Sequence, residues 1–540
     1  MTISDLAGLF PLASDVPADV SVKPLHQWET LIGGEMRPFR GRTKPVLSAL
    51  QFRTSDGSLA PVELGSFPLF SADDAQEALA AAASAYDSGR GKWPTMKVGD
   101  RIACVEHFAR LMVDRREEVV RLIMWEIGKT RGDAYKEFDR TIEYITATVD
   151  ALKELDNSNS RFQIVDGTIA QIRRAPLGVV LCMGPYNYPL NETFTTLIPA
   201  MIMGNTVVLK PPKYGALLFY PLLSAFQKAF PPGVVNTVYG YGEEMVPQLM
   251  ATGKVNVLAL IGSSRVADPL KKQHPKSNRL RAVLGLDAKN PAIVLADANM
   301  DVAVRECVTG ALSFNGQRCT ALKIIFVHRS IAETFVARLT SAVEKLKCGM
   351  PWEQGVQITP LPDQQKTRFL LGCIDDAVSH GANVMNKGGG DVAGTLFRPA
   401  VVYPVDKRMR LYHEEQFGPI VPVVPFDDES EPLNYVIESK YGQQASVFGY
   451  DPQKIGSLSD ELVNQVCRVN LNCQCQRGPD VFPFAGRKDS AEGTLSVSDA
   501  LRAFSIRSMI ATKELTEDKK LLNSILDGHY SNFISTGFLL

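Results

Sequence analysis

The sequence predicts an α/β protein with a parallel sheet covered by helices on both faces, and two alternating segments support this class. From residue 175 to 287, apolar runs such as GVVLCM and TVVLK alternate with segments of helical periodicity. A second alternating segment follows, in which PAIVLA and KIIFVH are strands on either side of the helix MDVAVRECVTGALSF. The composition, with 45% hydrophobic and 22% charged residues, is that of an ordinary globular protein.

The remaining elements follow from local patterns. Residues 1–70 are rich in Pro, Gly and Ser and are expected to form an irregular N-terminal arm, whereas residues 71–155 have helical periodicity. The segment RFQIVDGTIAQIRR has two alternating runs around Asp166-Gly167, which predicts a hairpin. Further helices are predicted at 330–347, 365–381 and 430–440, a strand within 495–512, and a tail at 513–540.

The charge balance excludes whole classes of partner. Lys and Arg total 58 and Asp and Glu total 59, so the chain has no basic surface for nucleic acid or an anionic membrane. Nine cysteines without zinc or CxxC spacing predict a reducing, cytoplasmic location and no metal site. The first ten residues contain no Lys or Arg, which argues against a secretory signal.

The longest uncharged stretch runs from Ala175 to Leu209 and is interrupted only by Glu192. It contains prolines, asparagines and a glycine, which would make insertion of this stretch into a bilayer energetically costly. We therefore expect a buried strand–helix–strand unit and no membrane partner.

Three candidate ligand-binding features lie where predicted parallel strands end, which is where such sheets bind ligands. Asn187 follows GVVLCM, and its amide would suit a developing oxyanion, although a simple turn asparagine explains it equally. Lys210 and Lys213 lie where a nucleotide's ribose or phosphates would bind, or at a solvated helix start. Gly262-Ser263 opens a helix whose backbone N–H groups would face a pyrophosphate.

Cys319 is the candidate nucleophile. It lies in the polar turn NGQRCT directly after Arg318, and a cationic neighbour lowers the pKa of a thiol and increases its reactive thiolate fraction. The alternative is an inert, buried structural cysteine.

The motifs MGPYNYPLN, GNTVVLKPP, FNGQRCTALK, EEQFGP and QRGPDVFPFAG together resemble the NAD(P)-dependent aldehyde dehydrogenase superfamily over about residues 70–510. The sequence is most similar to the branch of non-phosphorylating, NADP-dependent glyceraldehyde-3-phosphate dehydrogenases. This resemblance implies a Rossmann-like cofactor domain, an α/β catalytic domain and a small β oligomerisation part. The implied domains are cofactor-binding at 71–157 and 175–287, oligomerisation strands at 158–174 and 495–512, and catalytic at 288–494.

The resemblance also implies roles for single residues. Cys319 would attack the aldehyde carbon, and Asn187 with the Cys319 backbone N–H would hold the oxyanion. Loss of a hydride would leave a thioester, which water cleaves. For the cofactor, with NADP expected and NAD retained as an alternative, the implied binding residues are Lys210, Lys213, Gly262, Ser263, Glu415 and Phe417. The implied assembly is a homodimer or homotetramer.

The substrate implied by this branch is glyceraldehyde 3-phosphate, a small phosphorylated aldehyde. Four residues match the branch's phosphate site by motif or position, namely Arg140, Tyr188, Arg318 and Arg477. Guanidinium groups suit a phosphate because they bind it in a bidentate manner.

The sequence departs from the family at the general base. Most members have a glutamate four residues before a lysine, here Lys289, but this chain has Gly285 at that position. Three explanations compete. Asp287 would share a strand face with position 285 and act as a substitute base; coenzyme A would resolve the thioester; or the chain is a slow or inactive relative with a binding or structural role.

Overall fold

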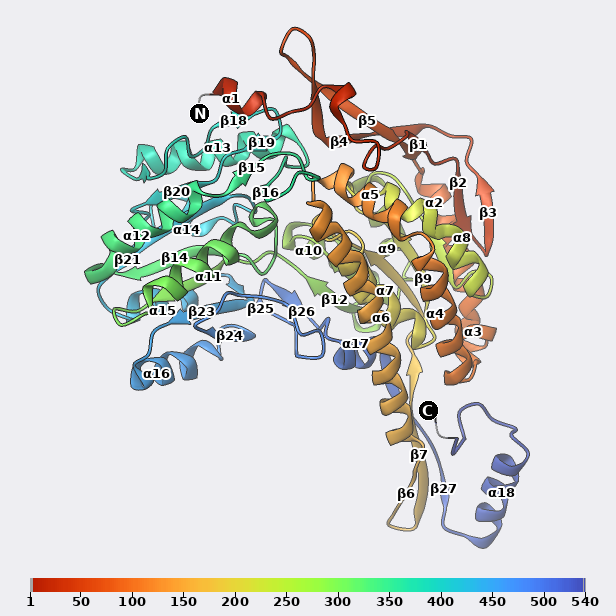
Figure 1. Cartoon of the computed structure of the whole chain (residues 1–540). Coiled ribbons are helices and arrows are strands. Elements are labelled where there is room, and N and C mark those ends of the chain that lie inside the picture. Colours follow the sequence, from red (N-terminus) through yellow and green to blue (C-terminus); the bar gives the residue numbers. More distant parts are fainter. Residues whose placement is uncertain (1–2, 538, 540) are drawn as a thin grey trace.

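The computed structural model describes residues 3–537 and 539 and contains two α/β units (Figure 1). The first is built on a six-stranded sheet in the order β10-β9-β8-β11-β12-β26. Its strands are β8 (Val179–Met183), β9 (Thr206–Lys210), β10 (Val235–Thr237), β11 (Val257–Ile261), β12 (Arg281–Gly285) and β26 (Ala491–Glu492). All pairs are parallel except β12 with β26, so the predicted parallel sheet is confirmed.

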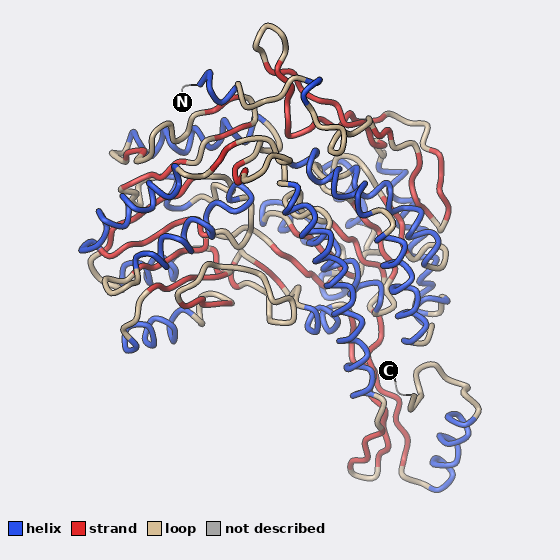
Figure 2. Tube along the Cα trace, viewed as in Figure 1, coloured by secondary structure: helices blue, strands red, loops and turns tan. Residues whose placement is uncertain are grey.

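Helices cover both faces of this sheet (Figure 2). On one face α2 (Ala72–Tyr86) packs on β8, β9 and β10, and α9 (Gly242–Ala251) and α10 (Ser264–Gln273) follow it. On the other face lies α7 (Asn191–Ile202), with α4 (Val98–Val113) and α6 (Arg131–Asn159) packed against it. All twelve residues of α7 are buried, which explains the long uncharged stretch in the sequence.

The second unit has a seven-stranded sheet in the order β17-β20-β21-β14-β13-β23-β24. Its strands are β13 (Asn290–Val294), β14 (Leu322–His328), β17 (Asn383–Val384), β20 (Ala400–Tyr403), β21 (Ile420–Phe426), β23 (Gln444–Phe448) and β24 (Arg468–Leu471). Its helices are α11 (Met300–Leu312), α12 (Arg329–Glu344), α13 (Gln364–Ser379), α15 (Ser430–Glu438) and α16 (Pro452–Leu462). Strands β13 and β14 and helix α11 follow the prediction and flank Cys319.

A three-stranded antiparallel arm projects from the first unit (Figure 1). It consists of β6 (Phe162–Val165), β7 (Thr168–Pro176) and β27 (Ser505–Lys513). The β6–β7 hairpin is confirmed, and its turn residues Asp166 and Gly167 have φ of 50° and 71°, as a type I′ turn requires. The oligomerisation role of this arm stays a prediction.

The strand expected within 495–512 is partly wrong. Residues Val497–Ala503 form the helix α17, which packs on α6 and α7, and the strand begins only at Ser505. The helix forms because Val497, Ala500 and Leu501 lie on one helical face and are buried there. The tail also contains a helix, α18 (Thr516–Asp527).

The expectation of an irregular N-terminal arm is wrong as well. Strands β4 (Thr43–Arg53) and β5 (Leu59–Pro68) pair antiparallel, β1 (Leu25–His26) adds to β5, and β2 (Glu29–Ile32) pairs with β3 (Glu35–Pro38). Burial overrides the Pro- and Gly-rich composition here, because Ala49 and Leu50 of β4 are inaccessible and β4 packs on α5 (Arg116–Ile127). No helix among the described residues has the length and hydropathy needed to cross a membrane.

Candidate active site

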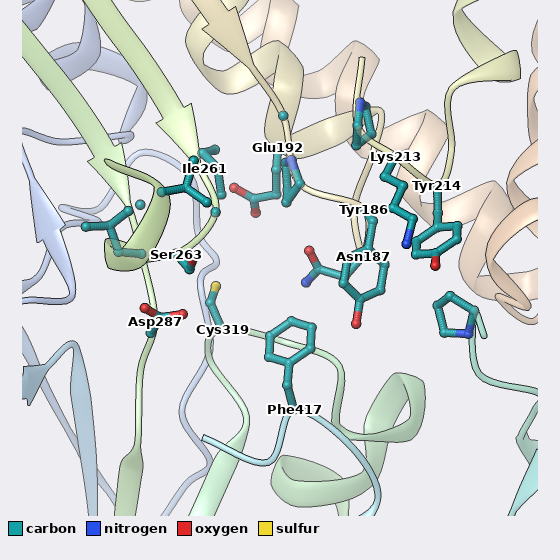
Figure 3. Close-up of a pocket in the computed structure, with 18 of the residues that line it drawn as sticks. Tyr186, Asn187, Glu192, Lys213, Tyr214, Ile261, Ser263, Asp287, Cys319 and Phe417 are labelled. Carbon is teal, nitrogen blue, oxygen red and sulfur yellow. The ribbon is translucent and has the colours of Figure 1, made fainter. Parts of the chain in front are cut away.

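A cavity of about 710 Å³ lies at the carboxyl ends of β8, β9, β11 and β12 (Figure 3). The predicted site residues that line it are Asn187, Lys210, Lys213, Gly262, Ser263, Cys319, Glu415 and Phe417. The four predicted phosphate ligands are not among its lining residues. The residues predicted from their places at the ends of parallel strands therefore line the cavity, while the four predicted phosphate ligands lie beside it.

Cys319 follows a strained turn. Phe314 and Asn315 have φ of 48° and 56°, in the left-handed region that a bulky residue such as Phe314 rarely adopts. Buried hydrogen bonds hold this conformation: Asn315 Nδ2 donates to the Thr359 carbonyl at 3.1 Å and Thr359 N donates back to Asn315 Oδ1 at 3.0 Å. Asn290 Nδ2 donates to the Cys319 carbonyl at 2.7 Å. The Cys319 backbone N–H donates to no residue in the described part of the chain, so it is available to a ligand.

The thiol is not activated in the way the sequence suggested. Burial and the negative charge of Glu192 raise the pKa of Cys319, although Lys323 and Arg477 act in the opposite direction. Arg318 points elsewhere, because its Nη2 donates to the Gly310 carbonyl at 2.9 Å and to Gln474 Oε1 at 3.3 Å. The expectation that Arg318 lowers this pKa is therefore wrong.

Asn187 is fixed by groups that the sequence did not reveal. Its Nδ2 donates to the Gln317 carbonyl at 2.8 Å, which leaves its second amide hydrogen for a ligand. Lys129 Nζ donates to the Asn187 carbonyl at 2.8 Å and forms a fully buried ion pair with Glu137. Glu137 Oε1 in turn accepts from Leu190 N at 3.0 Å. Lys129 and Glu137 are distant from Asn187 in sequence, and no local motif marks them.

Lys210 and Lys213 differ in their surroundings. Lys210 is buried, its Nζ donates to the Pro211 carbonyl at 3.1 Å, and burial lowers its pKa to about 8. Lys213 is exposed, and its Nζ lies 3.9 Å from Asp363 Oδ2, which also accepts a hydrogen bond from Tyr214. Both ammonium groups are therefore open to an anionic ligand in the cavity.

The start of α10 already holds a carboxylate. Asp287 Oδ2 accepts from Ser264 N at 2.9 Å and from Ser264 Oγ at 3.0 Å. The shared-face argument for Asp287 fails because β12 ends at Gly285, so Asp287 lies beyond the pleat. Asp287 stabilises the helix N-terminus, and one of the N–H groups expected to face a pyrophosphate is occupied by it.

Glu415 and Phe417 face the cavity from the second unit. Glu415 forms an ion pair with the buried Lys323 and accepts from Ala288 N at 3.2 Å. Phe417 has a φ of 42°, and its ring meets that of Tyr186 edge-on at 5.9 Å between centroids. Lys323, on β14, was missed by the sequence analysis because an apolar strand surrounds it.

The four predicted phosphate ligands form a group beside the cavity, and its arginines are largely paired. Arg140 binds Asp480 in a bidentate manner at 3.0 and 2.7 Å. Arg477 Nε lies 3.2 Å from Asp480 Oδ1, and its Nη1 pairs with Glu192. Arg318 Nε, by contrast, is buried and has no hydrogen-bond partner among the described residues.

Tyr188 lies in the same neighbourhood but faces another cation. Its ring packs over Lys129 Nζ, 3.5 Å from the ring centroid. Of the two carboxylates that pair with these arginines, Asp480 lies three residues after Arg477 in QRGPD, whereas Glu192 is distant in sequence.

The family model of the aldehyde dehydrogenase family matches residues 58–510. The chain belongs to this family. Among curated aldehyde dehydrogenases, the NADP-dependent glyceraldehyde-3-phosphate dehydrogenase of Streptococcus equinus is 32% identical over 466 residues, covering 84% of this chain and 93% of that protein. Malonate-semialdehyde dehydrogenase 1 of Geobacillus kaustophilus is 29% identical, covering 83% and 92%.

Solved aldehyde dehydrogenase structures share the fold. The NADP-dependent glyceraldehyde-3-phosphate dehydrogenase of Bacillus halodurans, complexed with NADP, matches with a TM-score of 0.82 and 30% identity over 91% of this chain and all of that one. Betaine aldehyde dehydrogenase of Staphylococcus aureus, in complex with NAD+, matches with a TM-score of 0.81 and 25% identity, covering 91% and 95%. The expected aldehyde dehydrogenase fold is confirmed.

The cavity of this aldehyde dehydrogenase also meets the chemical requirements of a dinucleotide. Lys210 and Lys213 supply positive charge, and Phe417 supplies an aromatic face on the opposite wall. Within residues 3–537 and 539, no group of three or more His, Cys, Asp and Glu side chains is arranged to hold a metal ion.

Proposed function

We propose that this aldehyde dehydrogenase oxidises glyceraldehyde 3-phosphate to 3-phosphoglycerate with NADP, through a thioester on Cys319. One observation carries the chemistry: Cys319 and Asn187 line the same cavity, each with an N–H hydrogen not used within the described chain. Two such donors in one cavity can stabilise the charge that develops on an aldehyde oxygen when sulfur adds to its carbon.

The steps follow from these positions. The sulfur of Cys319 attacks the aldehyde carbon while the thiol proton passes to solvent, and the oxygen takes negative charge between the Cys319 N–H and the Asn187 amide. Lys210, Lys213, Glu415 and Phe417 would hold NADP, which would supply the acceptor for the hydride that leaves this carbon. A thioester on Cys319 remains, and its hydrolysis releases the acid.

The choice of NADP rests on the lysines. A 2′-phosphate needs local positive charge, and Lys210 and Lys213 supply it at the end of β9. The B. halodurans relative is described as complexed with NADP, which supports the same choice here. NAD remains the alternative cofactor, because the S. aureus relative is in complex with NAD+.

The phosphorylated substrate is supported by the names of the relatives and by Arg140, Tyr188, Arg318 and Arg477. Because Arg477 now pairs with Glu192 and Asp480, the substrate phosphate would have to take the place of a carboxylate there. Arg318 Nε, buried without a partner among the described residues, is the donor that a phosphate would satisfy without such an exchange.

We further propose that the enzyme is a homodimer or homotetramer joined through the β6–β7–β27 arm. Strand β27 exposes Ile506 and Ile510 on one face and Met509 on the other, and such apolar side chains are suited to burial against a second copy. Light scattering after size-exclusion chromatography tests this, and a monomer at micromolar concentration would contradict it.

Gly285 favours a second candidate, in which coenzyme A rather than water accepts the acyl group. A glycine cannot take a proton from water, whereas a thiol acceptor needs less assistance. In that case coenzyme A would accelerate turnover after the first NADPH is formed.

A burst assay tests the proposal. Enzyme, NADP and glyceraldehyde 3-phosphate are expected to give one NADPH per Cys319 rapidly, followed by slower turnover that coenzyme A does not change. Unphosphorylated glyceraldehyde and NAD, used separately, should each reduce kcat/KM. Absence of NADPH with the phosphorylated substrate would contradict the proposal, and acceleration by coenzyme A would favour the second candidate.

A further inference from the structure

Glu192 is a charged residue in a buried apolar helix next to the nucleophile. It lies at the start of α7, whose other residues are uncharged, and its side chain lines the same cavity as Cys319. Figure 3 shows its carboxylate and the Cys319 thiol pointing into the same hollow. A buried carboxylate is costly, so its presence calls for a chemical reason.

One oxygen of the Glu192 carboxylate is held in place by Arg477, and the other is not. Arg477 binds its Oε2, and that guanidinium is itself fixed by Asp480 and by the Leu495 carbonyl, to which Nη2 donates at 3.1 Å. No described residue donates a hydrogen bond to Oε1 of Glu192. One oxygen therefore sets the orientation, and the other can accept a proton from water.

The other carboxylates of the cavity are engaged elsewhere. Asp287 holds the start of α10, and Glu415 pairs with Lys323. Asp363 accepts from Tyr214 and from Lys366 N at the cofactor end. Glu192 lines the cavity with Cys319, and its negative charge contributes to the raised pKa of that thiol.

We propose that Glu192 is the general base of thioester hydrolysis, in place of the carboxylate that position 285 lacks. Glu192 takes a proton from water while the water oxygen bonds to the thioester carbon. The carbon–sulfur bond then breaks, the acid leaves, and sulfur departs as thiolate, which regains a proton from Glu192. No electron is transferred in this step, so it needs no co-reactant beyond water.

This proposal rests on the proposed function only in requiring a thioester on Cys319, so an ester substrate tests it separately. 4-Nitrophenyl acetate acylates a reactive cysteine without cofactor or aldehyde and releases 4-nitrophenolate. The wild type is expected to show a burst of one nitrophenolate per site followed by steady turnover. In Glu192→Gln the burst should remain, and the steady rate should fall by roughly 10²–10⁴-fold.

Two further variants separate base catalysis from structure. Glu192→Asp keeps the charge and the Arg477 pair but shortens the reach, so the steady rate should fall by roughly tenfold with the burst intact. In the double variant Glu192→Gln with Gly285→Glu, a carboxylate is restored from the other wall. A Cβ at position 285 meets Leu495 Cδ1 at 3.3 Å and Ile261 atoms at 3.5 and 3.6 Å, so a Cβ is accommodated there with a small shift of Leu495.

We expect the steady rate of the double variant to be at least tenfold higher than that of Glu192→Gln alone. The control variant, Glu192→Gln with Gly285→Ala, should show no such increase. A steady rate in Glu192→Gln and Glu192→Asp within threefold of wild type would overturn the proposal. So would loss of the burst in folded Glu192→Gln, or no burst in the wild type. If ester turnover behaves as expected but aldehyde and NADP yield no NADPH, the proposed oxidation fails while the role of Glu192 stands.

Discussion

At the end of β9 Lys210 donates to a backbone carbonyl, whereas Arg477, beside the cavity, pairs with two carboxylates. Lys213, which is exposed where Lys210 is buried, is only loosely paired, at 3.9 Å from Asp363. Arg140 repeats the tight pattern of Arg477 through its bidentate contact with Asp480. Cations that look equivalent in the sequence therefore do different work: the lysines remain available to an anion, and the arginines stabilise the protein's own carboxylates.

The largest effect is expected from removing Arg477, which should reduce the stability of the protein. Arg477→Leu would leave Glu192 buried and unpaired and would weaken the hold on Asp480, so we expect the free energy of unfolding to fall by about 3–5 kcal/mol. Chemical denaturation measures this change. Lys213→Leu is the matched control and should shift stability by less than about 0.5 kcal/mol because Lys213 is exposed. Equal losses in both variants would contradict the comparison.

Removing Lys210 should affect ligand binding instead of stability. In Lys210→Met we expect NADP affinity to fall by roughly 10–150-fold, the worth of a charge-assisted hydrogen bond to the 2′-phosphate. NAD affinity should change by less than about threefold. The melting temperature should not fall, because the substitution removes a buried charge whose ammonium group has one carbonyl partner. Calorimetric titration with both cofactors checks this. A parallel loss for NAD would show that Lys210 does not bind the 2′-phosphate.

The lowered pKa of Lys210 allows its proposed contact with the 2′-phosphate to be tested by pH, without a substitution. Burial lowers this pKa to about 8, so the side chain is charged at pH 7 and mostly neutral at pH 9. The affinity for NADP relative to NAD should therefore fall by roughly tenfold as pH rises from 7 to 9. Lys210→Met should abolish this pH dependence. An affinity ratio that is constant over this range would contradict the assignment.

The smallest effect is expected at Lys213. Its exposure means that solvent screens the charge, so Lys213→Glu should weaken NADP binding by roughly two- to fivefold and leave NAD binding unchanged. High salt should reduce the difference further. An effect larger than that of Lys210→Met would reverse the ranking of the two lysines.

The parts of the site that the sequence predicted share one property. Asn187 and Ser263 each follow an apolar strand of the same parallel sheet, and Lys210 ends another, so local pattern and topology were enough to bring them together. Cys319 was found from its polar turn, although the reason given for its activation was wrong.

The parts that the sequence did not predict depend on contacts between distant segments. Glu192 and Arg477 are 285 residues apart, and no periodicity relates them. The irregular arm was a wrong prediction for a similar reason, because α5 supplies the buried surface that makes β4 a strand. Charge pairing and burial are decided by tertiary neighbours, which a single sequence does not list.

The long pairing of β7 with β27 has a consequence for synthesis of the chain. Thr168–Pro176 pairs along its whole length with Ser505–Lys513, and α17 just before β27 closes over α6 and α7. A ribosome adds roughly 5–20 residues per second, so β7 waits on the order of tens of seconds for its partner. During that interval the first α/β unit is incomplete even though most of its residues have emerged. The β7–β27 pair therefore cannot form until the second α/β unit, which lies between these strands in the sequence, has been synthesised.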